Sequence, residues 1–117
     1  MKFKTNPYQV VSWDEGFKEG INISKKIENE YTKEICINIS KGSFMKDHKA
    51  PFAITIQVLK GLIDFKVAKE QITLKELDSI SLKANEIHNL FALENSIVRL
   101  TLYKHDTIKR VENVLKI

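Results

Sequence analysis

The sequence is poor in the residues that build disulfide frameworks and zinc sites, since one cysteine, Cys36, is present among 117 residues. A single thiol excludes an internal disulfide and any zinc site made from paired cysteines. Cys36 stands between Ile35 and Ile37 in an apolar run. We therefore expect a small buried residue there rather than a reactive thiol.

Long hydrophobic runs are also absent. The longest apolar-rich stretches, Ala50 to Leu59 and Ile87 to Leu93, are far shorter than the ~20 residues that cross a bilayer. Met1 to Pro7 is polar, and no apolar segment typical of a signal peptide follows it. We expect a cytoplasmic protein with no membrane partner, and the chain length fits one compact domain.

Arginine is scarce, because Arg99 and Arg110 are the only arginines among 19 basic residues. The net charge of +4 is dispersed, since the lysines stand singly or in pairs between acidic residues. Aromatic residues are not interleaved with them in an RNA-binding pattern. We expect no nucleic-acid partner. The excess of lysine over arginine, with abundant isoleucine and asparagine, favours an AT-rich bacterial genome as the source.

No long helix is predicted between Gly20 and Tyr103, where short apolar and β-branched segments alternate with turns. Ile35, Ile37 and Ile39 share one face of such a segment, for example. Strands are predicted at residues 21–27, 34–39, 53–59, 62–67, 71–74, 79–82 and 97–103. Because no crossover helices are available, a parallel sheet is excluded and an all-β, antiparallel sandwich or barrel is predicted.

The two ends differ from this central region. Residues 1–19 hold Trp13 among polar residues. Three structures remain possible for this segment: an irregular arm, a short helix over 13–18, or an edge strand over 8–12. We expect Trp13 to pack on the barrel.

At the C-terminal end, Asp106 is predicted to cap a helix with Ile108, Val111 and Leu115 on one apolar stripe. The expected organisation is therefore an N-terminal arm (1–19), a barrel (20–105) and a C-terminal helix (106–117).

Two of the three histidines stand in informative segments. In the first segment, Gly42, His48 and Gly61 fall at the spacing of the first sequence motif of the cupin superfamily. In the second, Asp78 and His88 fall at positions of the second cupin motif, and Asn85 stands where a glycine is usual. Asparagine is one of the few residues that replaces glycine in a left-handed turn. Over residues 34–104 the sequence thus resembles the cupins, which implies a jelly-roll barrel.

The resemblance also implies a divalent transition metal held by three histidines and a glutamate, and here the sequence departs from the pattern. Ala50 occupies the position of the second histidine and Ile54 that of the glutamate, so only His48 and His88 remain as metal ligands. Two imidazoles alone make a weak site for such a metal.

Four other side chains are close enough in sequence to replace the missing ligands: Asp47, Cys36, Gln57 and His105. None of them is a compelling replacement. No cofactor is therefore firmly predicted.

Three hypotheses for the histidine pair remain open. The favoured one is a protein that binds a small molecule in the barrel without metal-dependent catalysis. The residues expected to line its ligand pocket are His48, Phe52, Ile54, Ile56, His88 and Phe91. The second is a metal-dependent enzyme of dioxygenase or isomerase type with an atypical ligand set, and the third is a structural dimer in which the two histidines only satisfy hydrogen bonds. A homodimer is expected from the family resemblance and from the apolar stripe on the C-terminal helix.

Overall fold

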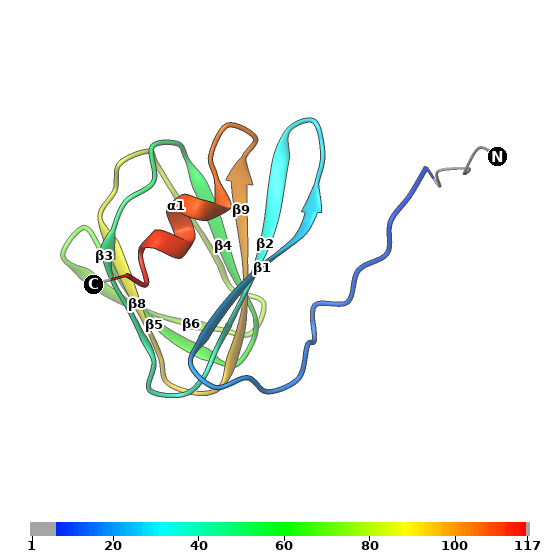
Figure 1. The fold of residues 1–117 in the computed structure, drawn as a ribbon. Helices are drawn as coiled ribbons and strands as arrows, with labels where there is room; N and C mark the ends of the chain where they lie inside the picture. The colour runs from blue at the N-terminus through cyan, green and yellow to red at the C-terminus, as the bar shows by residue number, and fades with distance from the viewer. Residues whose placement is uncertain (1–6, 117) are drawn as a thin grey trace.

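The computed structural model describes residues 7–116, which form nine β-strands and one short helix (Figure 1). The elements are β1 (Ile21–Glu28), β2 (Thr32–Ile39), β3 (Phe44–His48), β4 (Ile54–Lys60), β5 (Leu62–Val67), β6 (Glu70–Lys75), β7 (Ser79–Leu82), β8 (His88–Ala92), β9 (Ser96–Tyr103) and α1 (Ile108–Asn113). No helix in this part of the chain is long and apolar enough to cross a membrane.

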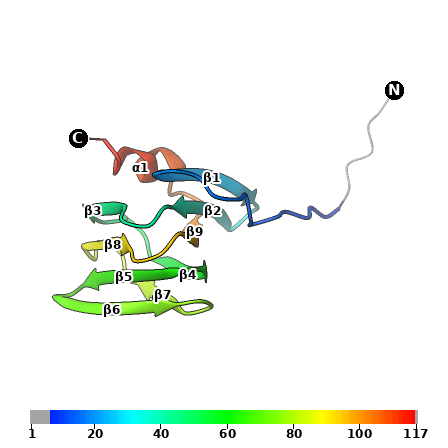
Figure 2. The ribbon, with the colours of Figure 1, turned by 90° about the horizontal axis from the view of Figure 1, so that it is seen from below.

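The strands form two antiparallel sheets that face each other. One sheet has the order β1-β2-β9-β4-β7 and the other the order β3-β8-β5-β6. This arrangement confirms the predicted antiparallel jelly roll with a C-terminal helix. Seen from below, α1 lies on the same side of the barrel as β1 to β3, away from β6 and β7 (Figure 2). Strands β3 and β8 were not among the strands predicted from the sequence. They carry His48 and His88, respectively.

The core fills the space between the two sheets with alternating aliphatic and aromatic side chains. Ile63 and Phe65 of β5 and Val98 and Leu102 of β9 are completely buried there. Burying each such side chain stabilises the fold by roughly 1.5–3 kcal/mol. The sheets are therefore held together by their inner faces, as the period-two pattern requires.

The N-terminal segment is an irregular arm over residues 7–19, and its first part runs away from the barrel (Figure 1). Further along, it covers the outer face of β2, because Asn38 donates a hydrogen bond to the Gly16 carbonyl (2.9 Å). The guanidinium of Arg99 lies 5.2 Å from the centre of the Trp13 ring. Cys36 is fully buried under this arm, as predicted, and β2 is buried on both faces rather than one.

The C-terminal helix is shorter than expected and begins differently. Thr107 rather than Asp106 is its cap, and the Thr107 hydroxyl accepts a hydrogen bond from the Arg110 amide (3.2 Å). Asp106 is instead buried against the Arg110 guanidinium. Of the predicted apolar stripe, Val111 is buried, whereas Leu115 is exposed. Residues 1–6 and 117 of the expected arm and helix lie outside the described residues.

Gly61 alone joins β4 to β5, and the model explains why glycine stands there. Its φ is +100°, and a Cβ added to it would lie 2.6 Å from the Asn95 carbonyl oxygen. Gly42 has a similar φ of +88° but has nothing within 4 Å of an added Cβ. We expect Gly61→Ala to lower the free energy of unfolding by about 1–3 kcal/mol more than Gly42→Ala, since only the former adds a clash to the shared backbone strain. Urea unfolding of both variants measures the difference, and equal losses would contradict it.

Candidate ligand-binding site

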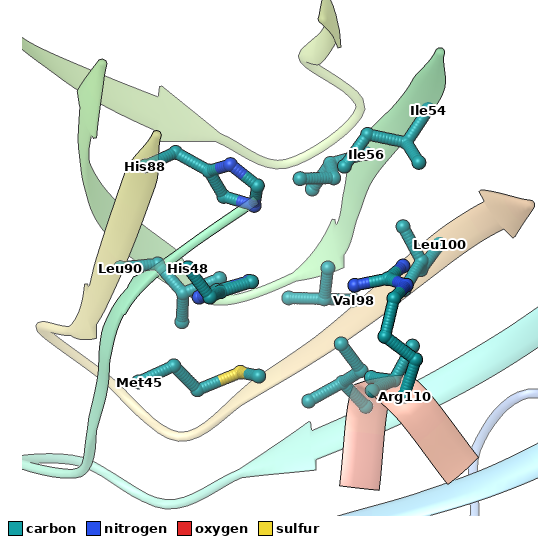
Figure 3. Close-up of a pocket in the computed structure, with 11 residues that line it drawn as sticks. Met45, His48, Ile54, Ile56, His88, Leu90, Val98, Leu100 and Arg110 are labelled. Carbon is teal, nitrogen blue, oxygen red and sulfur yellow. The ribbon is translucent and has the colours of Figure 1, made fainter. Parts of the chain in front are cut away.

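A small cavity lies between the two sheets beside α1 (Figure 3). Most of its lining is aliphatic, contributed by Ile37, Ile54, Ile56, Leu90, Val98 and Leu100. Its polar side chains are His48, His88 and Arg110. The cavity volume is about 20 Å³, which is little more than one water molecule needs. In this conformation the cavity therefore admits a single small chemical group.

The two histidines meet because β3 and β8 are neighbouring strands in which His48 and His88 are register partners. The register of β3 shifts between Met45 and His48. Strict alternation from the buried Met45 would place His48 on the outer face, so this irregularity turns its side chain inward. The two ring centres are 4.1 Å apart, in an edge-to-face arrangement. The His88 ring also stacks on Phe65, with 5.5 Å between centres.

Backbone carbonyls fix the proton on each imidazole. His48 Nδ1 lies 2.7 Å from the Lys46 carbonyl oxygen, and His88 Nδ1 lies 2.9 Å from the Glu86 carbonyl oxygen. A carbonyl oxygen only accepts hydrogen bonds, so both Nδ1 atoms carry the proton. In a neutral ring the Nε2 atom is then an acceptor with a free lone pair. No residue in the described part of the chain makes a hydrogen bond to either Nε2 atom.

Both rings are held in the neutral form at neutral pH. Burial lowers the pKa of His48, and the hydrogen bond to Lys46 opposes this only in part. Burial lowers the pKa of His88 to about 4, against the opposing effect of its hydrogen bond to Glu86. The positive charge of Arg110 lowers both pKa values further. The pair is therefore a pair of hydrogen-bond acceptors rather than a positive centre.

Arg110 reaches into the cavity from α1, on the opposite side from the two histidines (Figure 3). Its Nε and Nη2 atoms donate hydrogen bonds of 2.6 and 2.8 Å to the two carboxylate oxygens of Asp106. Asp106 is 1% exposed and the Arg110 side chain 23% exposed, so the ion pair is buried at its carboxylate end. The remaining nitrogen, Nη1, makes a long contact of 3.4 Å with the Lys49 carbonyl oxygen. One N–H of Nη1 and one N–H of Nη2 therefore remain as donors.

The predicted pocket residues divide into two groups. His48, His88, Ile54 and Ile56 all line the cavity. Phe52 and Phe91 do not, which corrects their predicted placement.

Phe91 alternates with the buried His88, Leu90 and Ala92 on β8 and so faces outward, beside its register partner Phe44. Phe52 lies in the loop before β4 and packs its ring against Tyr103, with 5.0 Å between centres.

Arg110 was missed because its scarcity was weighed only as a sign against nucleic-acid binding. Its position four residues after Asp106, in a segment predicted to be helical, is the sequence signal for this ion pair.

The residues present do not fit a resident transition metal, which needs three or more protein donors. The cavity offers His48 and His88, while the other family positions, Ala50 and Ile54, are buried and carry no donor. Among the described residues, no group of three or more histidine, cysteine, aspartate or glutamate side chains is placed to hold a metal ion.

The side chains weighed as replacement ligands lie elsewhere. Cys36 faces the N-terminal arm, 3.9 Å from the Trp13 carbonyl oxygen. Gln57 donates a hydrogen bond to the Leu77 carbonyl oxygen (3.2 Å). Asp47 is exposed and accepts a hydrogen bond from Asn89 (2.7 Å), and His105 is exposed, as expected.

Comparisons with known proteins find similarity in structure alone. No family model and no curated protein matches the sequence. A conserved protein of unknown function from Streptococcus pyogenes superposes with a TM-score of 0.72 at 18% identity, over 92% of this chain and 98% of that one. A cupin superfamily protein from Desulfitobacterium hafniense gives a TM-score of 0.71 at 11% identity, over 88% and 98% of the two chains.

An RmlC-like cupin from Shewanella frigidimarina superposes with a TM-score of 0.68 at 18% identity, over 77% of this chain and 81% of that one. At identities this low, the structural similarity establishes the fold of the chain alone. The chemistry of the site has to be inferred from the residues of the cavity.

Proposed function

The chain has the fold of the cupin superfamily, and we propose that it binds a small organic molecule in the cavity between its sheets, without metal-dependent catalysis. One observation carries this proposal. Two neutral imidazoles, His48 and His88, are fixed by backbone carbonyls so that each keeps an Nε2 lone pair in an otherwise aliphatic cavity. Apolar walls with a few fixed polar groups are typical of small-molecule sites.

A purely structural role explains the histidines less well. A structural role, in which the histidines bond to each other, to backbone carbonyls or to water, accounts for both Nδ1 atoms, since each donates to a backbone carbonyl of its own strand or loop. That role leaves the two Nε2 atoms without a use. The two Nε2 acceptors have no protein donor among the described residues, and a ligand or water can supply one.

The small volume of the cavity limits how a ligand enters. Only one small group fits beside the histidines in this conformation. The helix α1 closes one side of the cavity with Arg110 and Val111. We propose that a ligand of more than a few atoms is admitted by a shift of this helix.

Imidazole ¹⁵N resonances provide the direct test. We expect at least one class of small polar fragments, drawn from alcohols, amides, ketones and carboxylates, to shift the Nε2 resonances of both His48 and His88. His105 is the internal control, because it is exposed and outside the cavity. Bound fragments should also raise the melting temperature. The proposal fails if every fragment leaves the two buried histidines unchanged, or shifts His105 equally.

A further inference from the structure

We propose that the group taken up by this cavity is uncharged and donates hydrogen bonds, as a hydroxyl or a primary amide does, and that carboxylates and phosphates are rejected. The inference rests on the proposed function and names the class of ligand. The lining residues keep some hydrogen-bond donors and acceptors that no other protein group uses, and these free groups determine which ligand fits.

The histidine side of the cavity offers acceptors. Because both Nδ1 atoms donate to carbonyl oxygens, at 2.7 Å for His48 and 2.9 Å for His88, both Nε2 atoms present lone pairs. The ring centres are 4.1 Å apart, so the two acceptors belong to one small region. A group with N–H or O–H donors complements them, whereas a carboxylate would set its own lone pairs against theirs.

The arginine side of the cavity offers donors without a net positive charge. Asp106 already takes two hydrogen bonds from Arg110 and neutralises it within a buried pair. Nη1 is left with one long contact to Lys49, and it can donate to the carbonyl of an amide or the oxygen of an alcohol. Figure 3 shows the guanidinium facing the cavity across from the histidines.

The charge balance then decides between neutral and anionic groups. Arg110 is the one charged side chain in the lining, and Asp106, just outside the lining, already pairs with it, so that with both imidazoles neutral the cavity and this carboxylate together carry no net charge. A carboxylate would therefore bring an uncompensated negative charge into a space with aliphatic walls. Burying an unpaired charge is far more costly than burying a hydrogen-bonded neutral group.

Three probes with one carbon skeleton separate these cases: isobutyramide, isobutanol and isobutyrate. Each is titrated at neutral pH into ¹⁵N-labelled protein while the Nε2 resonances of His48 and His88 are followed. We expect the amide and the alcohol to bind at least roughly tenfold more tightly than isobutyrate, because the site is built for their hydrogen bonds.

Asp106→Asn is the matched variant, since it removes the carboxylate that neutralises Arg110 and keeps the size of the side chain. We expect it to shift the ratio of amide to carboxylate affinity toward isobutyrate by roughly tenfold. The wild-type comparison stands by itself if this variant is too unstable to titrate.

The outcomes distinguish this inference from the function on which it rests. Tighter binding of isobutyrate than of isobutyramide to the wild-type protein would overturn the inference and leave small-molecule binding intact. The same holds if neither neutral probe shifts the Nε2 resonances while other fragments do. If no fragment of any class shifts them, the proposed function fails as well.

Discussion

Arg110→Met is expected to lower the free energy of unfolding by about 3–5 kcal/mol, the usual cost of removing one partner from a buried ion pair. Asp106 is 1% exposed, and its two carboxylate oxygens accept hydrogen bonds of 2.6 and 2.8 Å from Arg110. Without Arg110, the main contact left to its carboxylate is the Thr107 amide (2.8 Å). Methionine keeps most of the apolar stem, so the loss reports on the charge rather than on packing.

Two further variants control this measurement, made by urea unfolding. Arg99→Met also removes an arginine from a buried carboxylate, Glu34, but that carboxylate keeps hydrogen bonds from Thr101 (2.6 Å) and Thr32 (2.9 Å). We expect it to cost clearly less. Adding Asp106→Asn to Arg110→Met should recover much of the loss, because no charge is then buried alone. A loss no larger than that of Arg99→Met would show that the pair at Arg110 is not buried in solution.

The fold could be predicted from the sequence because its signals are local. Alternating apolar residues, such as Ile35, Ile37 and Ile39, specify strands and a core face. The short connections leave no room for crossover helices. The histidine spacings place His48 and His88 on paired strands, and the model brings their rings together.

The parts that could not be predicted depend on contacts between distant segments or on local irregularity. A shift of register within β3 turns His48 inward, and no residue type marks it in the sequence. The burial of Cys36 was predicted from its apolar neighbours, but its cover by the arm around Trp13 was not, because alternation within β2 carries no sign of a segment over the outer face. The place of Arg110 in the cavity likewise depends on how α1 packs.

One error was avoidable. Once His88 is placed inward on β8, the period of two puts Leu90 and Ala92 inward and Phe91 outward. The prediction of Phe91 as a pocket residue runs against this parity. Large aromatic side chains beside a predicted site are therefore poor evidence of a pocket when the strand alternation opposes them.

His88→Phe is expected to remove a large part of the loss of stability that this protein shows between pH 7 and pH 4. The unfolded pKa of a histidine is about 6.5, whereas burial lowers that of His88 to about 4 in the folded state. Between these values the unfolded state binds the proton more readily, so stability is full above about pH 6.5 and falls as the pH falls. Linkage makes the His88 contribution roughly 3 kcal/mol between pH 7 and pH 4.

Phenylalanine suits this test because the ring contact with Phe65 is retained while the titrating nitrogens are lost. Urea unfolding at several pH values should give a flatter profile for His88→Phe than for the wild-type protein. His105→Phe, at an exposed position, should leave the wild-type profile unchanged. A profile for His88→Phe as steep as that of the wild-type protein would mean that His88 is hydrated in solution. His88 would then take up a proton near pH 6.5, and binding of hydrogen-bond donors by a neutral histidine pair would weaken as the pH falls toward that value.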